Sequence, residues 1–247
     1  MRYTEPVVLH SYPMNSSASK RLRIVVLSGA GMSAESGLKT FRGNDGLWNG
    51  HRVEDVATPE AWSRDPEAVL KFYNERRREL RHAEPNPKHR ALAGLEDRHE
   101  VQIITQNIDD LHERAGSTRV LHLHGELMFA RSQADEDCLY PLGERDIAVG
   151  DLCENELQLR PHVVWFGEEV PAMAEAVELV EQADLFLVVG TSLRVYPAAS
   201  LVGLIPPSCR RIWINPDAPM DGELEGFECV ASTAAKALAA IRDELVG

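Results

Sequence analysis

Five short apolar runs, each ending near Gly, Asn or Ser, restrict what this chain can fold into more than any other feature. Runs that are apolar on both faces and rich in β-branched residues are typical of buried parallel strands. The five runs are RIVVLSG (23–29), VQIITQN (101–107), HVVWFG (162–167), LFLVVGTS (185–192) and RIWINP (211–216). Helical spacing of apolar residues occurs between or after them, as in 173–183 and 234–245. The alternation predicts an α/β fold, a Rossmann-like doubly wound parallel sheet with right-handed crossovers.

Two stretches interrupt this alternation. Residues 44–90 hold consecutive helices and no strand, whereas residues 128–160 are acidic and lack periodicity. We expect both stretches to be insertions that pack as a smaller lobe beside the sheet. Lobe and sheet together form a single domain over 21–247, preceded by a polar N-terminal extension at 1–20.

Three dipeptides mark helix starts. Thr58-Pro59, Asp65-Pro66 and Asn86-Pro87 each offer a side chain that can cap a helix. The proline that follows has a fixed backbone suited to the first helical position. We therefore predict a helix that begins at each of these prolines.

Composition excludes several classes of partner. The chain has 247 residues and a formal net charge of -13, so it lacks the basic field that a nucleic-acid partner requires. No apolar run approaches the roughly 20 residues that cross a bilayer. The N-terminus also lacks the apolar core of a signal peptide. We expect a cytoplasmic protein without a nucleic-acid or membrane partner.

The segment GAGMSAESGLKTFRG (29–43) begins as a dinucleotide-binding turn and then departs from that pattern. Gly29, Gly31 and Ala34 fit the fingerprint G-x-G-x-x-G/A directly after an apolar run. An uninterrupted helix follows in an ordinary Rossmann unit, but here Gly37 comes within two turns. The sequence therefore predicts a phosphate-binding turn that leads into a loop.

Small and amide residues stand at the carboxyl ends of the other predicted strands, where α/β proteins bind ligands. QNID (106–109), GTS (190–192) and NPD (215–217) suit hydrogen bonds to phosphates and ribose hydroxyls. Taken alone, GTS and NPD are equally compatible with plain loops. His124 in LHLHGEL is suited to general-base chemistry near neutral pH, whereas His122 is expected to pack.

The motifs occur together and in order. GAGMSAESGLKTFRG, TQNIDDLHERAG, HLHGEL, RPHVVWFGE and VGTSLRVYPA resemble the signature blocks of the sirtuins, the NAD-dependent protein-lysine deacylases, and INPD and CVAS continue the match. The sequence is most similar to the bacterial CobB-like members. The resemblance implies a catalytic domain that consumes NAD and removes acyl groups from protein lysines. Its products are nicotinamide, O-acyl-ADP-ribose and the deacylated lysine.

The resemblance also implies roles for individual residues. His124 is the general base and forms the catalytic set with Asn107 and Asp109. The implied NAD-binding residues are Gly29, Ala30, Gly31, Ser33, Ala34, Phe41, Arg42, Trp48, Gln106, Asn107, Ile108, Asp109, Gly190, Thr191, Ser192, Asn215 and Ala231. Phe41 and Arg42 lie on a segment that can close over the nicotinamide ribose and shield it from water.

The acyl-lysine substrate is expected to occupy an apolar channel. The resemblance places this channel at Val163, Trp165 and Phe166, whose walls suit a neutral acylated side chain better than a free ammonium. Tyr73 and Arg76 share one helix face and resemble the Tyr-x-x-Arg pair of sirtuins that remove succinyl and malonyl groups. A guanidinium beside a phenol suits a terminal carboxylate. The other interpretation is a solvated basic helix face.

One departure concerns the zinc that most sirtuins bind through four cysteines in the small lobe. Ser132 stands where the first cysteine is expected, and the chain has no C-x-x-C pair. Cys138 and Cys153 supply only two thiolates, although structural zinc sites are almost always four-coordinate. We predict that no metal is bound and that packing holds the lobe together.

Two alternatives remain open. The glycine fingerprint alone fits a nicotinamide-dependent oxidoreductase, although Glu54 and Asp55, near the expected acidic position, do not end a second strand. The absent zinc motif fits a non-catalytic NAD-sensing or scaffold protein. Against this second alternative, His124, Asn107 and Asp109 are all present.

Overall fold

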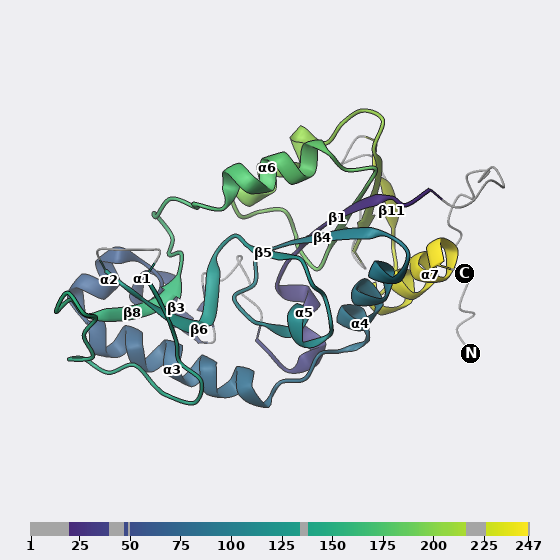
Figure 1. Cartoon of the computed structure of the whole chain (residues 1–247). Helices are drawn as coiled ribbons and strands as arrows, with labels where there is room; N and C mark the ends of the chain where they lie inside the picture. Colours follow the sequence, from purple (N-terminus) through teal and green to yellow (C-terminus); the bar gives the residue numbers. More distant parts are fainter. Residues whose placement is uncertain (1–19, 40–46, 49, 134–137, 216–225, 247) are drawn as a thin grey trace.

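The computed structural model describes residues 20–39, 47–48, 50–133, 138–215 and 226–246. Its centre is a six-stranded parallel sheet with helices on both faces, and a second lobe lies at one end (Figure 1). In spatial order the strands are β11 (Glu228–Val230), β10 (Arg210–Ile214), β9 (Leu185–Val189), β1 (Arg23–Ser28), β4 (Glu100–Thr105) and β5 (Val120–His122).

Strand β1 lies in the middle of this sheet. Its Ile24 is opposite Val101 of β4 on one side and Leu185 of β9 on the other. Ile24 contributes to the core on one face of the sheet and Val25 to the core on the other, with at most 2% of either residue exposed. Because β1 is buried on both faces, its sequence is a continuous apolar run. The chain leaves β1 toward β4 and later enters β9, which creates a topological switch point beside Ser28.

Helices cover both faces of the sheet. One face packs against α4 (Pro87–Ala93), η3 (Gly94–Asp97) and α7 (Ala234–Val246). The other face packs against α6 (Met173–Glu181) and η4 (Ala198–Leu204), and Figure 1 shows α6 across the sheet from α4. This arrangement confirms the predicted doubly wound α/β fold. The short helix α5 (Leu111–Arg114) follows β4.

The second lobe has its own hydrophobic core, to which Phe72, Tyr73, Leu127 and Trp165 contribute. A three-stranded antiparallel sheet, in the order β7-β6-β8, packs against helices there. The strands are β6 (Gly125–Ser132), β7 (Leu139–Pro141) and β8 (Leu159–Val163), and the helices are α1 (Val53–Val56), α2 (Pro59–Arg64) and α3 (Pro66–His82). The predicted bounds of the domain and of its insertions stay a prediction.

The three predicted helix starts are confirmed. Thr58 Oγ1 accepts a hydrogen bond from Ala61 N at 3.1 Å, and Asp65 Oδ1 accepts one from Ala68 N at 3.0 Å. Asn86 caps α4 in the same way, and proline occupies the first turn in all three helices. Each cap satisfies backbone N–H groups that a helix start otherwise leaves without a partner.

Two strand predictions are wrong. The run 162–167 was expected to form a buried parallel strand, but β8 ends at Val163 and pairs antiparallel with β6 in the second lobe. An apolar run indicates burial, but it does not indicate the direction or the partner of a strand. The stretch 44–90 was expected to hold no strand, yet β2 (Leu47–Trp48) and β3 (His51–Arg52) form a short antiparallel pair. Strands of two residues are too short to leave a periodic pattern.

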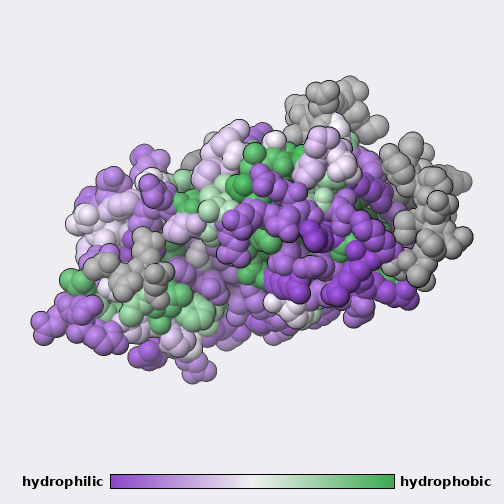
Figure 2. Space-filling view, turned by 45° about the horizontal axis from the view of Figure 1, so that its top comes forward, coloured by the Kyte–Doolittle hydropathy of each residue, from purple (hydrophilic) through white to green (hydrophobic). Residues whose placement is uncertain are grey.

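The surface in Figure 2 is mostly hydrophilic, and hydrophobic residues appear on it as separate patches. Within the described residues, no helix combines the length and the apolar character that crossing a membrane requires.

Candidate active site

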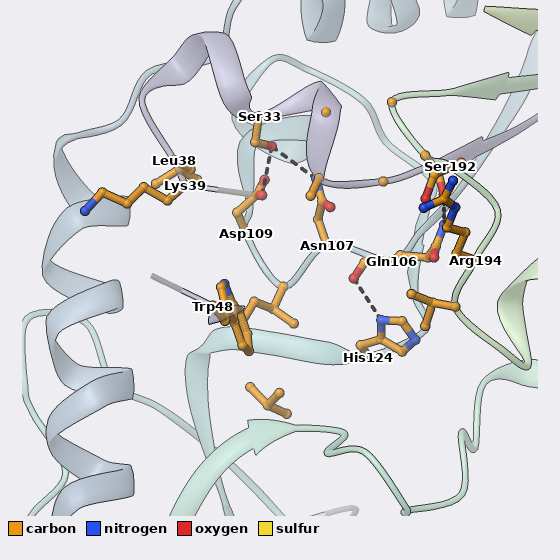
Figure 3. Close-up of a pocket in the computed structure, with 18 of the residues that line it drawn as sticks. Ser33, Leu38, Lys39, Trp48, Gln106, Asn107, Asp109, His124, Ser192 and Arg194 are labelled. Carbon is orange, nitrogen blue, oxygen red and sulfur yellow. Dashed lines mark hydrogen bonds between the residues drawn. The ribbon is translucent and has the colours of Figure 1, made fainter. Parts of the chain in front are cut away.

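A cavity of about 1050 Å³ opens at the carboxyl ends of four parallel strands and extends along the second lobe. Its sheet side is formed by the loops that follow β1, β4, β9 and β10, and the second lobe contributes Tyr73 and Trp165. Figure 3 shows Ser33, Asn107 and Asp109 close together, with His124 and Ser192 further along the cavity. The size and position suit a large ligand that spans the switch point.

The turn after β1 packs directly on the loop after β9. Gly31 N donates to the Gly190 carbonyl at 2.8 Å, and a Cβ on Gly31 would lie 2.9 Å from Cα of Gly190. Two short 3-10 turns follow, η1 (Ala30–Met32) and η2 (Ala34–Ser36), and Gly37 ends them with a φ of 88°. The prediction that no uninterrupted helix follows the fingerprint is confirmed. Glycine is required here because two backbones approach too closely for side chains.

His124 lies beside β6 with its ring in the cavity. Its Nδ1 lies 2.9 Å from the carbonyl oxygen of Gln106. A carbonyl can only accept, so Nδ1 carries the proton and the neutral ring presents an unprotonated Nε2. Burial lowers the pKa of His124, and the hydrogen bond to Gln106 partly opposes this effect. The ring is therefore held as a neutral base at neutral pH.

Asp109, Ser33 and Asn107 form a buried polar cluster above the cavity. Ser33 Oγ donates to Asp109 Oδ2 at 2.8 Å, and Asn107 Nδ2 donates to Ser33 Oγ at 3.1 Å (Figure 3). Burial raises the pKa of Asp109, whereas the hydrogen bond from Ser33 lowers it. The cluster links the turn after β1 to the loop after β4. It therefore fixes the positions of these two sides of the cavity relative to each other.

His122 contacts the loop after β4 from outside the cavity. Its Nδ1 lies 3.0 Å from the Asn107 carbonyl oxygen, and its Nε2 lies 2.8 Å from Glu113 Oε1. Burial alone lowers the pKa of His122, but the hydrogen bond and charge of Glu113 raise it overall. A protonated ring satisfies both acceptors at once. His122 therefore supports Asn107 and is not among the cavity-lining residues.

Tyr73 and Arg76 project from α3 toward the far end of the cavity. Tyr73 is fully buried and its hydroxyl accepts a hydrogen bond from Trp165 Nε1 at 3.1 Å. Arg76 is only 6% exposed, and within the described residues its Nε has no hydrogen-bond partner. The guanidinium carbon lies 5.1 Å from the centre of the Trp48 ring. Burial of this kind contradicts the alternative that Arg76 belongs to a solvated basic face.

Trp165 is fixed by a buried ion pair. Arg160 makes two hydrogen bonds to Glu168, of 2.6 and 3.0 Å, and its guanidinium carbon lies 3.3 Å from the centre of the Trp165 ring. Glu168 Oε2 also accepts from Trp165 N at 2.8 Å. Burial alone raises the pKa of Glu168, but Arg160 lowers it overall. The paired charges fix Trp165 in the part of the cavity wall that contacts Tyr73.

Most of the sequence-predicted site residues lie together. Those that line the cavity are Gly29, Ala30, Gly31, Ser33, Trp48, Tyr73, Arg76, Gln106, Asn107, Ile108, Asp109, His124, Val163, Trp165, Phe166, Gly190, Thr191, Ser192 and Asn215. Ala34 and Ala231 do not line it, since Ala34 begins the second 3-10 turn and Ala231 follows the edge strand β11. Phe41 and Arg42 lie outside the described residues.

Sequence reasoning missed several polar residues of the cavity, among them Glu35, Lys39, Lys88, Glu168 and Arg194. They come from loops and helix ends, where no periodic pattern distinguishes them. Lys88 did leave a signal, because a lysine in the first turn of a helix opposes the helix dipole.

The cysteines of the second lobe hydrogen-bond to neighbouring side chains. Cys153 Sγ lies 3.4 Å from Ser132 Oγ, and Cys138 Sγ lies 3.1 Å from the Tyr140 hydroxyl. In the described part of the chain, no three or more His, Cys, Asp or Glu side chains are grouped as metal ligands would be. These donor sets do not fit a four-coordinate zinc.

A parallel sheet with a glycine turn at its switch point, joined to a lobe that carries an apolar wall, defines a Rossmann-like dinucleotide-binding protein. The model of the Sir2 family matches residues 29–197, and the chain belongs to this family. A Helicobacter pylori protein named NAD-dependent protein deacylase is 50% identical over 223 residues, which cover 90% of this chain and 97% of the relative.

Further relatives agree. A protein of the same name from Aggregatibacter actinomycetemcomitans is 56% identical over 194 residues, which cover 78% of this chain and 92% of that one. A solved complex of a Sir2 homologue with NAD is 40% identical and has a TM-score of 0.79. The match covers 90% of this chain and 89% of that structure.

Proposed function

We propose that this protein removes acyl groups from lysine side chains of proteins and consumes NAD as a co-substrate. It is an NAD-dependent protein deacylase of the Sir2 family. The observation that carries the proposal is the neutral His124, whose Nε2 faces a cavity that joins the glycine turn to the Trp165 wall.

The chemistry follows from this arrangement. The acyl oxygen of the substrate attacks the ribose carbon that bears nicotinamide, and nicotinamide leaves. His124 then accepts the proton of a ribose hydroxyl, which attacks the acyl carbon. A water molecule adds to this carbon and the lysine amine leaves, so that the acyl group stays on the ribose. The Asn107, Ser33 and Asp109 cluster holds the ribose end of the cavity, and Gly29 to Ser33 bind the diphosphate. The products are free lysine, nicotinamide and O-acyl-ADP-ribose.

Mass spectrometry of the products tests this proposal. NAD and an acetyl-lysine peptide should yield equal amounts of nicotinamide, O-acetyl-ADP-ribose and deacetylated peptide. The His124→Ala variant should form these products at least about 100-fold more slowly, because a positioned general base contributes that much. Formation of NADH would instead favour the oxidoreductase. NAD binding without any product would favour the non-catalytic sensor.

The position of Glu54 and Asp55 argues further against the oxidoreductase. Both residues lie on α1 in the second lobe. A dinucleotide dehydrogenase instead holds the ribose with an acidic residue about 20 positions after the glycine motif, near the end of the second strand. The next strand of the parallel sheet here is β4, which is far along the chain.

We further propose that the enzyme accepts acyl chains ending in a carboxylate, such as succinyl, as well as acetyl. Arg76 supports this because it is buried at the cavity with an Nε that has no hydrogen-bond partner among the described residues. A buried guanidinium gains most from a carboxylate. The Tyr73 hydroxyl accepts from Trp165, so its own proton can be donated to the same carboxylate.

The acyl preference is tested by kcat/KM on succinyl- and acetyl-lysine peptides. Arg76→Met should lower the value for succinyl at least tenfold and leave the value for acetyl within about threefold, because a charge-assisted hydrogen bond contributes about 1.5 to 3 kcal/mol. Arg78→Met is the matched control, since Arg78 lies on the same helix but is half exposed and pairs with Asp146. An equal loss on both peptides would contradict acyl-acid recognition.

We also propose that the second lobe folds without zinc. The hydrogen bonds of Cys138 and Cys153 to neighbouring side chains support this. Metal analysis of purified protein should find far less than one equivalent of zinc. One equivalent that is lost on Cys153→Ser substitution would contradict the proposal. The cytoplasmic location and the absence of nucleic-acid and membrane partners remain predictions. The net charge of -13 supports the absence of a nucleic-acid partner.

A further inference from the structure

Lys88 is an almost fully buried lysine at the cavity. Only 2% of the residue is exposed, and it lies in the first turn of α4 beside the glycine turn. Its Nζ donates to the Gly31 carbonyl oxygen at 2.8 Å and lies 3.4 Å from Glu35 Oε1. These two contacts account for two of the three N–H bonds of the ammonium, so one remains for a ligand.

The position of Lys88 is costly. Burying an ammonium removes it from water, and a cation in the first turn of a helix opposes the helix dipole. Burial lowers the pKa of Lys88, although Glu35 partly opposes this effect. The carboxylate of Glu35 is about half exposed, so it compensates the charge only in part. A residue with these costs is best explained by an anion that adjoins it in the working state.

The residue that caps α4 contacts the same turn. Asn86 Nδ2 donates to the Met32 carbonyl oxygen at 2.8 Å and lies 3.0 Å from Ser36 Oγ. Asn86 and Lys88 thus donate hydrogen bonds to two successive carbonyl oxygens of the turn. A phosphate would be repelled by a free carbonyl oxygen at the same place, so this arrangement prepares the turn for an anion.

We propose that Lys88 positions the diphosphate of the dinucleotide, by holding the Gly31 carbonyl and by supplying a buried positive charge to the anion. The inference rests on the proposed binding of NAD at Gly29 to Ser33. It explains how a chain with a net charge of -13 binds the two negative charges of a diphosphate at a cavity that Glu35 and Asp109 also line.

Calorimetric titration of the full chain with ADP-ribose and with adenosine tests the role of Lys88. Lys88→Met should weaken binding of ADP-ribose at least tenfold and leave binding of adenosine, which has no phosphate, within twofold. Lys88→Arg should recover part of the loss because it restores the charge. Lys71→Met, on the exposed side of α3, is the control and should change neither affinity.

A second variant keeps the inference testable if Lys88 variants do not fold. Glu35→Gln removes the competing carboxylate from an exposed position, so ADP-ribose should bind at least twofold more tightly. Unchanged ADP-ribose affinity in a folded Lys88→Met variant would overturn the inference, as would a loss of adenosine affinity equal to the loss of ADP-ribose affinity. If the Lys88 variants do not fold, unchanged ADP-ribose affinity in Glu35→Gln would overturn it. If the unaltered protein fails to bind ADP-ribose, the proposed NAD site itself is wrong.

Discussion

We expect the protonation of His124 to set the lower pH limit of activity. Burial lowers its pKa below the ordinary value of 6.5, and the proposed mechanism uses the neutral ring as the base. The rate should therefore be constant around neutral pH and fall only as the pH drops below 6.5. The measurement is kcat/KM for the acyl peptide between pH 4.5 and 8. An acid limb with its midpoint above 6.5 would contradict this prediction.

A histidine elsewhere provides the control for this profile. His82 lies exposed at the end of α3. His82→Gln should leave both the height and the acid limb of the profile unchanged, whereas His124→Ala should remove the activity that titrates.

Gly190 is the residue on which the packing of turn and loop depends most. Its φ is 67°, and a Cβ there would lie 2.5 Å from Met32 N. Gly190→Ala should separate the two backbones, weaken ADP-ribose binding at least tenfold and destabilise the fold by roughly 2 to 3 kcal/mol. Isothermal titration and urea unfolding measure the two effects.

Gly37→Ala separates backbone strain from steric clash. Gly37 also has a positive φ, of 88°, but a Cβ there meets nothing within 4 Å. Its substitution should cost about 1 kcal/mol of stability. If Gly190→Ala were no worse than Gly37→Ala, close packing of turn and loop would not be the reason for this glycine.

Individual residues differed in how well the sequence revealed them. His124 and Asp109 follow strands within recognisable motifs, so their positions at one edge of the sheet could be predicted. Glu168 could not, because its importance comes from its contact with Arg160, which no sequence pattern indicates. The helix position of Lys88 is unusual, but it does not reveal the contact with Gly31, which is distant in the sequence. From sequence alone, a charged residue is predicted to lie at the surface.

At the scale of elements, the sequence predicted strands better than their pairing. β1, β4, β9 and β10 are expected from their apolar runs and are present within one to three residues. The edge strands β5 and β11, of three residues each, were not predicted. Short edge strands need few apolar residues, because one side of each lies outside the sheet. The run that contains the end of β8 was placed in the wrong sheet for another reason, because an apolar run does not indicate the partner of a strand.

The connection between β8 and α6 depends on Glu168. This carboxylate binds Arg160 and lies 3.5 Å from Arg131 NH2, and both guanidinium groups are largely buried. Glu168→Gln would remove the negative charge that lies between two buried guanidinium groups, so it should destabilise the fold by roughly 2 to 3 kcal/mol. The activity on all acyl peptides should fall together, because Trp165 loses its support. Urea unfolding and kcat/KM measure the two effects.

An exposed ion pair provides the comparison for Glu168. Asp55 and Arg64 lie 3.0 Å apart, with 57% of each side chain exposed. Asp55→Asn should change the stability little, since exposed pairs contribute almost nothing. Equal effects of the two substitutions would show that burial does not strengthen the Glu168 contacts.

At the scale of the whole molecule, the cavity exists only because two separate cores meet along it. The sheet contributes the turn and the polar cluster, and the second lobe contributes Tyr73 and Trp165. In the proposed function, a dinucleotide bound to the first core lies next to an acyl-lysine bound to the second. The sequence could predict that a smaller lobe exists, but only the fold shows that its apolar wall faces the carboxyl ends of the parallel strands.

The stability of the whole molecule should depend on pH through two buried histidines. His89 and His112 are fully buried with ring centres 4.9 Å apart, and His112 Nε2 lies 3.1 Å from Ser28 Oγ beside the glycine turn. Burial lowers the pKa of His89 to about 4 and that of His112 to about 3. The folded state therefore keeps both rings neutral at pH values where the unfolded chain, with a pKa near 6.5, binds protons.

The sign of the effect follows from this difference. Above pH 6.5 neither state binds the protons and the pair costs nothing, but as the pH falls from 6.5 toward 4 only the unfolded state gains them. Stability should fall by about 2 kcal/mol per histidine between pH 7 and 5. Urea unfolding at several pH values measures this slope. Whatever its effect on the stability at pH 7, His89→Gln should reduce the change of the free energy of unfolding with pH by about half. His82→Gln should leave this change as it is. An unchanged slope in His89→Gln would mean that other groups cause the acid sensitivity.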